Sequence, residues 1–177
     1  MNIVTWALGM RSVFRWVSIL LLMVGVSLGF LLSPAAQAAP VEPADPYVLR
    51  YLQATEPVSL PLNSQGKFQS FTAADLSVGK RIFEDSCKNC HVGGATLPNP
   101  MVSLALEDLK GATPPRNTIE GLVAYQREPL TYDGQDFGFG CRDVPESWLP
   151  DEELKKLAAF ILRAAEVAPG WGIDRFS

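Results

Sequence analysis

Cys87-Lys88-Asn89-Cys90-His91 is the stretch of this sequence that decides its fold. On a helical turn, positions i and i+3 lie on one face, so the thiols of Cys87 and Cys90 can reach two vinyl groups of one macrocycle. His91 follows directly and can turn its imidazole towards a metal at the centre of that macrocycle. The spacing C-x-x-C-H is typical of haem c attachment. It predicts one covalent haem c, with Cys87 and Cys90 as attachment points and His91 as the proximal axial ligand of the iron.

Two other kinds of site use the C-x-x-C spacing. A zinc site needs four ligands, but the sequence offers only one further cysteine, Cys141, and no second histidine. A thioredoxin-like redox pair belongs to a βαβ unit, which the sequence pattern does not predict. The helical pattern before the motif and the single histidine inside it therefore favour haem. Cys141 remains as an odd cysteine that calls for an explanation.

Residues 1–38 have the pattern of a signal peptide. Arg11 and Arg15 precede an apolar run from Trp16 to Leu32, and the small-x-small pattern Ala36-Gln37-Ala38 follows. A retained membrane anchor is the alternative, because the run is close to the ~17 residues that a spanning helix needs. The position of the small residues favours cleavage and export.

Cleavage after Ala38 would shorten the chain from 177 to 139 residues, enough for one domain with one core. It would remove two basic and no acidic residues, which leaves 13 basic against 19 acidic side chains and a formal charge of −6. Nucleic acid and anionic lipid are therefore disfavoured as partners, and a basic protein surface is favoured.

The first part of the mature chain is predicted to be a proline-rich N-terminal arm, residues 39–57, lying at the periphery. Within it, Asp45-Pro46 predicts the start of a short helix that runs through Gln53. Two short alternating runs, residues 58–62 and 67–71, flank a turn-rich tetrapeptide and predict a small β-hairpin.

Three helices are predicted after the hairpin. Thr72 and Asp75 form a near capping box for a helix that leads to Cys87. A second helix is expected from Asn117 to about Arg127. The last begins at Asp151 and ends before Pro169-Gly170, and its apolar stripe belongs to the core: Leu154, Leu157, Ala158, Ile161, Leu162 and Ala165.

Helix packing can also be predicted. Gly79 and Phe83 are four residues apart on one helical face, which lets another helix cross closely at the glycine. The regular structure is sparse for this chain length, and a haem would supply the missing apolar core.

Several segments resemble cytochrome c-550 of cyanobacterial photosystem II, and the match extends over about residues 58–134. They are VSLPLNSQGK (58–67), GKRIF (79–83), CHVGG (90–94), ATPPR (112–116), IEGLV (119–123) and TYDG (131–134). The resemblance implies a mostly α, class I cytochrome c fold over residues 58–177. In that fold the last helix is expected to cross the helix before the motif at Gly79, through Phe160 and Leu157. It also implies an extrinsic protein, peripheral to the membrane on the lumenal side of the thylakoid, with photosystem II subunits or a lumenal redox protein as partners.

The same resemblance implies a low-potential haem held between two histidines, the second lying a few residues beyond the TYDG segment. This chain has no histidine there, and Cys141 stands at nearly the same offset. Residues 39–57 and 135–177 also match poorly, which indicates a c-550-like paralogue.

Cys141 is therefore a candidate for the distal axial ligand, as a thiolate. Gly138 and Gly140 permit close approach of the backbone to a flat cofactor, and Arg142 favours the thiolate. An anionic ligand stabilises ferric iron and predicts a low potential. Three alternatives remain open: ligation by Met101, an open or water-ligated site, and a Cys141 that is free or bridged to another molecule.

Three functions follow as hypotheses, none of them enzymatic. The first is electron transfer at low potential with a lumenal partner. The second is a structural role as an extrinsic photosystem II subunit able to stand in for cytochrome c-550. The third is a haem-based redox or gas sensor in which Cys141 leaves the iron.

Overall fold

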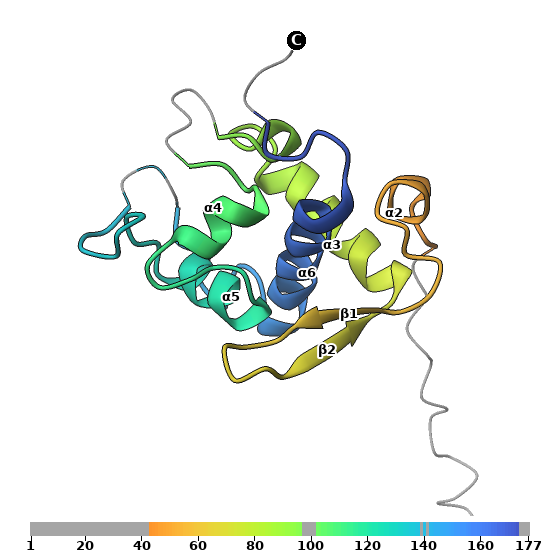
Figure 1. Cartoon of the computed structure of the whole chain (residues 1–177), viewed down its shortest axis with the longest axis horizontal. Helices are drawn as coiled ribbons and strands as arrows, with labels where there is room; N and C mark the ends of the chain where they lie inside the picture. The colour runs from red at the N-terminus through yellow and green to blue at the C-terminus, as the bar shows by residue number, and fades with distance from the viewer. Residues whose placement is uncertain (1–42, 97–101, 139, 141, 174–177) are drawn as a thin grey trace, which may run out of the picture. The chain divides into compact units, whose positions relative to one another are not determined.

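The computed structural model describes residues 43–96, 102–138, 140 and 142–173. Figure 1 labels the elements in chain order: α2 (Pro46–Arg50), β1 (Val58–Pro61), β2 (Phe68–Phe71), α3 (Ala73–Ser86), α4 (Leu106–Gly111), α5 (Ile119–Arg127) and α6 (Asp151–Val167). The predicted mostly helical fold with a small antiparallel hairpin is confirmed. The predicted signal peptide, Met101 and Cys141 lie outside the described residues. Within the described ranges, no helix has the length and apolar character needed to cross a membrane.

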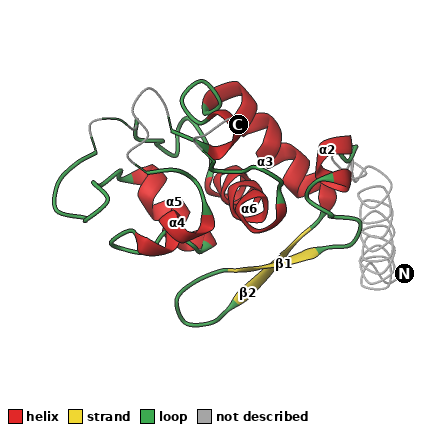
Figure 2. Cartoon of the chain, turned by 45° about the horizontal axis from the view of Figure 1, so that its top comes forward, coloured by secondary structure: helices red, strands yellow, loops and turns green. Residues whose placement is uncertain are grey.

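Helices α3 and α6 cross at Gly79, as the sequence predicted. A Cβ placed on Gly79 would collide with the carbonyl oxygen of Lys156 and lie 2.9 Å from the Cβ of Phe160. One turn further along α3, the ring of Phe83 lies 5.4 Å from that of Phe160, centroid to centroid. Figure 2 shows α6 nearly end-on beside α3. The missing side chain of Gly79 therefore sets how closely the two helices approach.

The core side of α6 follows the predicted stripe. Leu154, Leu157, Ala158, Ile161 and Leu162 are buried, whereas Ala165 is only partly buried. Three acidic residues occupy the first turn of this helix, where a negative charge interacts favourably with the helix dipole.

The hairpin has the predicted strands and a regular register, with Val58 opposite Phe71 and Pro61 opposite Phe68. In its turn, Asn63 Oδ1 accepts hydrogen bonds from the amides of Gln65 and Lys67 at 3.1 and 3.4 Å. The side chains of Leu60 and Phe71 are buried, so the hairpin attaches to the core by one face.

The starts of the next helices agree closely with the sequence. Thr72 and Asp75 form a full capping box on α3. The helix predicted from Asn117 begins at Ile119, because the side chain of Thr118 caps it by accepting a bond from the Gly121 amide. The short helix α4 was not predicted.

The expectation of a peripheral N-terminal arm is wrong for its described part, from residue 43 onwards. Val48 and Leu52 are fully buried, and Arg163 Nε on α6 donates to the Leu52 carbonyl at 2.9 Å. Proline content suggested a loose approach, but burying each of these aliphatic side chains stabilises the fold by about 1.5–3 kcal/mol. Helix α2 starts at Pro46 as predicted and ends at Arg50, before Gln53.

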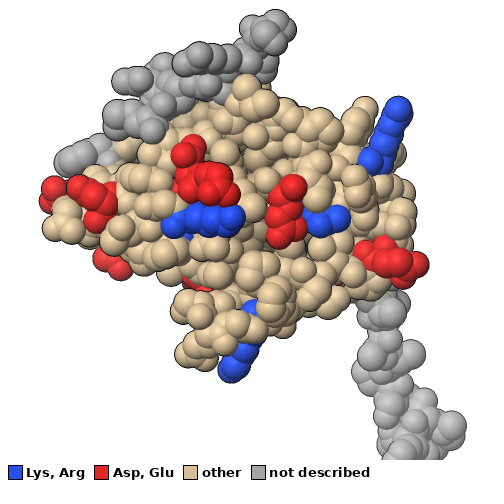
Figure 3. Space-filling model, viewed as in Figure 1, with Lys and Arg blue, Asp and Glu red and all other residues tan. Residues whose placement is uncertain are grey.

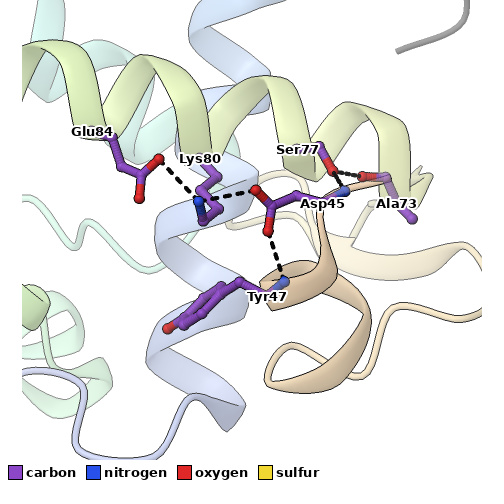
Figure 4. A network of polar contacts seen from close by, with 6 residues as sticks. All are labelled: Asp45, Tyr47, Ala73, Ser77, Lys80 and Glu84. Carbon is purple, nitrogen blue, oxygen red and sulfur yellow. Dashed lines mark hydrogen bonds and ion pairs between the residues drawn. The ribbon is translucent and has the colours of Figure 1, made fainter. Parts of the chain in front are cut away.

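A polar network fastens α2 to α3 (Figure 4). The Asp45 amide donates to Ser77 Oγ at 2.8 Å, and Asp45 Oδ1 accepts from the Tyr47 amide at 2.7 Å. Lys80 Nζ lies 3.0 Å from Asp45 Oδ2 and 2.9 Å from Glu84 Oε2. Asp45 therefore caps α2 and binds the neighbouring helix with the same side chain.

Candidate haem site

The C-x-x-C-H motif lies at the end of α3 and continues its turn. Cys87 is the C-cap residue, and its amide donates to the Phe83 carbonyl at 2.8 Å. The amides of Cys90 and His91 both donate to the Cys87 carbonyl, at 3.1 and 3.0 Å. Cys87 is half-buried and Cys90 is exposed. The backbone thus keeps a helical turn through the motif, which is the conformation that the i, i+3 argument for two thiols on one side requires.

The loop after His91 is a single 3-10 turn, Val92–Gly94, with both glycines at positive φ. A Cβ on Gly94 would lie 2.6–2.7 Å from atoms of the Trp171 indole, so only glycine fits beneath that ring. Trp171 Nε1 donates to the Leu104 carbonyl at 3.0 Å, and the Gly172 amide donates to the Gly93 carbonyl at 2.8 Å. The segment that follows α6 therefore closes over the loop that carries His91.

Three aromatic rings form the wall behind this loop. Trp171 packs against Phe83 at 5.4 Å and edge-on against Phe160 at 5.7 Å between ring centroids. Each pair is worth about 0.5–1.5 kcal/mol beyond the area that it buries. The cluster joins α3, α6 and the chain after α6, and so holds the end of α3 in place.

The His91 imidazole is mostly enclosed. Burial lowers the pKa of His91 below its ordinary value, and a hydrogen bond with the Ala95 backbone opposes this shift. His91 Nδ1 lies 3.2 Å from the hydroxyl oxygen of Thr96, which is also 2.6 Å from the Val102 carbonyl oxygen. The neutral imidazole is the form that binds a metal.

Arg116, which follows α4, holds the backbone of a second region, the residues that precede Cys141 in sequence. Arg116 is 7% exposed, and its Nη2 donates to the carbonyls of Leu130 and Thr131 at 3.0 and 2.8 Å. Its guanidinium carbon lies 3.7 Å from the centre of the Tyr125 ring. Within the described part of the chain, Arg116 Nε is buried without a hydrogen-bond partner.

The described neighbours of Cys141 are fixed on both sides. The Gly138 amide donates to the Pro129 carbonyl at 2.9 Å, and the Val144 amide donates to the Gln126 carbonyl at 2.8 Å. The Val144 carbonyl in turn accepts from Arg127 Nη1 at 2.6 Å. Both flanks of Cys141 are thus bonded to the C-terminal end of α5 or the residues just beyond it.

The donor set fits a haem c. The motif supplies two thiols on one turn and an imidazole whose Nδ1 already has a neighbour, which leaves Nε2 for a metal. Among the residues that the structure describes, no group of three or more His, Cys, Asp or Glu side chains is placed to hold a metal ion. The zinc alternative therefore gains no support from the geometry.

Sequence reasoning missed three residues near the site. Arg116 was noted only as part of a matching segment, and neither Thr96 nor Trp171 was singled out. A hydroxyl residue shortly after a candidate ligand histidine, and a tryptophan directly after a helix-ending Pro-Gly, are the signals that could have pointed to the last two. Arg116 gives no such local signal, because its partners are the distant carbonyls of Leu130 and Thr131.

Comparisons with known proteins agree with the motifs. The cytochrome c-550 domain matches residues 51–177. A cytochrome c-550-like protein of Thermosynechococcus vestitus is 58% identical over 149 residues, which cover 84% of this chain and 85% of that protein. The photosystem II extrinsic protein V of Gloeobacter violaceus is 50% identical over 131 residues, covering 74% of this chain and 70% of that protein.

A solved structure agrees as well. The PsbV2 cytochrome from Thermosynechococcus elongatus is 62% identical, with a TM-score of 0.72, and the similarity covers 73% of this chain and 99% of that one. The predicted family resemblance and the predicted cofactor are confirmed by these matches. The chain belongs to the cytochrome c-550 family, whose cofactor is a covalently bound haem c.

Proposed function

We propose that this chain is a low-potential electron-transfer cytochrome of the thylakoid lumen, with its haem bonded to Cys87 and Cys90 and ligated by His91. The observation that carries the proposal is the turn at the end of α3. The Cys87 amide donates to the Phe83 carbonyl, and the amides of Cys90 and His91 donate to the Cys87 carbonyl. The bound haem supplies one-electron chemistry. The protein holds the imidazole, encloses it, and fixes the backbone on which both thiols stand.

The attachment is tested by mass spectrometry of the exported protein together with the Cys87→Ser and Cys90→Ser variants. We expect the wild-type chain to carry one haem that survives denaturation. Each single variant should lose one thioether bond and shift the optical bands of the denatured, reduced haem, and the double variant should lose covalent haem entirely. A wild-type mass without a haem adduct would refute the proposal.

We further propose that Cys141 is the distal axial ligand, as a thiolate. The support is its sequence position, where family resemblance expects a ligand, and the hydrogen bonds that fix Gly138 and Val144 on its two sides. Arg142 is adjacent in sequence and its charge favours the thiolate. A thiolate stabilises ferric over ferrous iron, so the pair His91 and Cys141 gives a low potential.

Electron paramagnetic resonance of the ferric protein tests this ligand. Cys141→Ser should abolish the low-spin thiolate signal and raise the potential, whereas Cys141→His should restore a low-spin spectrum of two-histidine type. Met101→Leu serves as the control and should leave the signal unchanged. If the Cys141→Ser spectrum equals that of the wild type, the ligand is another residue or water.

The partner that we propose is the lumenal side of photosystem II or a lumenal redox protein. The relative from Gloeobacter is a photosystem II extrinsic protein, which supports an extrinsic role for this chain. The formal charge of −6 expected after signal cleavage favours a basic partner surface. On the face in Figure 3, acidic and basic side chains lie intermixed, so docking would depend on local charge pairs as well as on the net charge.

Deleting the gene for cytochrome c-550 in the same organism tests whether this chain is an extrinsic photosystem II subunit or a freely diffusing electron carrier. If this chain stands in for that subunit, it should co-purify with photosystem II from the deletion strain, and growth should then depend on it. Rapid reduction by a soluble donor, without co-purification, would favour free electron transfer. The relatives that match are cytochromes and photosystem subunits, so they lend no support to the gas-sensor hypothesis.

A further inference from the structure

The hydroxyl of Thr96 lies between the His91 imidazole and a backbone carbonyl. Thr96 Oγ1 is 2.6 Å from the Val102 carbonyl oxygen and 3.2 Å from His91 Nδ1. A hydroxyl group has one hydrogen, and a carbonyl oxygen can only accept. The hydroxyl hydrogen is therefore committed to Val102, and Thr96 Oγ1 can only accept from the imidazole.

The direction of this hydrogen bond fixes the tautomer of His91. If Thr96 Oγ1 accepts, His91 Nδ1 must carry the hydrogen, and the lone pair of the neutral ring is on Nε2. The hydroxyl is also a better acceptor than an isolated one, because its own donation to Val102 polarises it. A stronger acceptor at Nδ1 increases the basicity of Nε2.

We propose that Thr96 is a positioning residue that holds His91 in the Nδ1–H tautomer and strengthens it as an iron ligand through the relay to Val102. The inference rests on the proposed role of His91 as proximal ligand and adds a residue to it. The effect is chemical as well as steric, since a more basic imidazole stabilises ferric over ferrous iron.

The carbonyl at the end of the relay is itself held in place. The Leu104 amide, two residues beyond Val102, donates to the Gly94 carbonyl at 2.7 Å. Trp171 Nε1 donates to the Leu104 carbonyl at 3.0 Å. The relay therefore lies in a backbone that Gly94 and Trp171 fix independently of Thr96.

The Ala95 backbone is the rival partner for the ring, because its hydrogen bond also favours a protonated imidazole nitrogen. If Ala95 alone orients His91, removing the Thr96 hydroxyl will leave the ring chemistry unchanged. Orientation by Thr96 and orientation by Ala95 therefore predict different results for a substitution that removes the Thr96 hydroxyl but keeps the size of the side chain.

The test compares Thr96→Val, which keeps the shape and removes the hydroxyl, with Thr96→Ser, which keeps the hydroxyl. Ser103→Ala is the matched control, because Ser103 is the neighbour of Val102 and its hydroxyl bonds Asp108 Oδ2 at 2.6 Å rather than the histidine. All three are measured as holoproteins, for reduction potential and for the NMR signal of the His91 ring NH in the ferrous state, using protein labelled with nitrogen-15.

Thr96→Val should raise the equilibrium constant for haem reduction about tenfold, equivalent to ~59 mV for one electron, and should shift the Nδ1–H signal. Thr96→Ser should restore both values, and Ser103→Ala should leave both unchanged. Equal values for Thr96→Val and wild type, or an equal shift in Ser103→Ala, would overturn the role of Thr96. Absence of covalent haem from the wild type would instead refute the proposed function on which this inference rests.

Discussion

Two regions of this chain carry the residues proposed to hold the haem, and these regions are fixed in different ways. The proximal segment, residues 87–96, continues directly from α3, and its turn through Cys87, Cys90 and His91 is fixed by hydrogen bonds between near neighbours. The distal segment, whose described residues are 129–138, 140 and 142–144, lies between α5 and α6 in sequence. The side chains of Arg116 and Arg127 donate to its carbonyls at Leu130, Thr131 and Val144. A turn built on a helix end can be predicted from a local motif, whereas a segment held by side-chain hydrogen bonds to its backbone carbonyls cannot.

The largest effect is expected from Gly79→Val, which disrupts the contact between α3 and α6 that supports the proximal segment. The added side chain would collide with the backbone carbonyl of Lys156, which no side-chain rotation can relieve. We expect a loss of more than about 5 kcal/mol and no holoprotein. Asp85→Val, at an exposed position on the same helix, is the control. Recovery of Gly79→Val holoprotein with wild-type thermal stability would mean that the helices do not need this contact.

Phe83→Ala should have the next largest effect. The ring is 4% exposed and packs against both Phe160 and Trp171, so its removal should cost about 3–5 kcal/mol. The yield of haem protein should fall more than the potential of the surviving protein shifts. Phe68→Ala, at a site that is 64% exposed, should have little effect on either. Urea unfolding measures the stability, and the haem content per chain measures the yield of haem protein. A normal yield for Phe83→Ala would mean that the packing of Phe83 against Phe160 and Trp171 does not support the haem site.

Arg116→Leu tests the distal segment. It removes both hydrogen bonds to the Leu130 and Thr131 carbonyls, so the unfolding free energy should fall by about 2 kcal/mol. Because the loosened residues precede Cys141, the distal-ligand spectrum should become heterogeneous while the His91 ring signal stays the same. Arg50→Leu is a matched control, since Arg50 is an exposed arginine near a tyrosine ring. An altered His91 signal in Arg116→Leu would show that the two regions are coupled.

The smallest effect is expected from Asp45→Asn, which keeps a helix-capping side chain and removes the charge that binds Lys80. Burial acts to raise the pKa of Asp45, but hydrogen bonds from Lys80 and the Tyr47 amide outweigh it and hold the pKa below its ordinary value of 3.8. A carboxylate with a lowered pKa stabilises the fold above pH 3.8, and this contribution is lost as the pH falls through the pKa of the folded state.

Asp45→Asn should therefore be less stable than wild type by about 0.5–1 kcal/mol at pH 7, and the difference should vanish at low pH. Urea unfolding at several pH values measures it. Glu107→Gln, in the exposed pair with Lys110, should show a smaller difference at neutral pH. A difference between Asp45→Asn and wild type that persists at pH 2 would mean that the charge of Asp45 is not its cause.

Much of the fold could be predicted from the sequence because it follows local rules. The hairpin, the Thr72 capping box and the stripe on α6 each depend on spacing within one short segment, and all three are confirmed. The crossing of α3 and α6 at Gly79 is also confirmed, but its partner helix was predicted from the family resemblance. The burial of Val48 and Leu52 was missed because it depends on which surface α2 meets. Proline content in the flanking sequence says nothing about that surface.

In the candidate site, too, the features set by local spacing could be predicted and those set by tertiary contacts could not. The local turn through Cys87, Cys90 and His91 could be predicted, and the roles of these residues stay predictions, as does the role of Cys141. The position of Thr96 shortly after His91 was a local signal that was missed, whereas Arg116 could not be found from spacing, because its partners depend on how loops fold back. The hydrogen bond from Trp171 to Leu104 spans 67 residues, and no local pattern in the sequence specifies it.

The closure of the loop by Trp171 and Gly172 also bears on the order in which the chain folds. Helix α3 and the turn through Cys90 are closed by hydrogen bonds between near neighbours, whereas the Gly93–Gly172 hydrogen bond requires that α6 has docked. A nascent chain would therefore present its two thiols on an early, local structure while the lid over the histidine loop is still open. In that order of folding, a porphyrin could reach the thiols before Trp171 packs against Phe83 and Phe160.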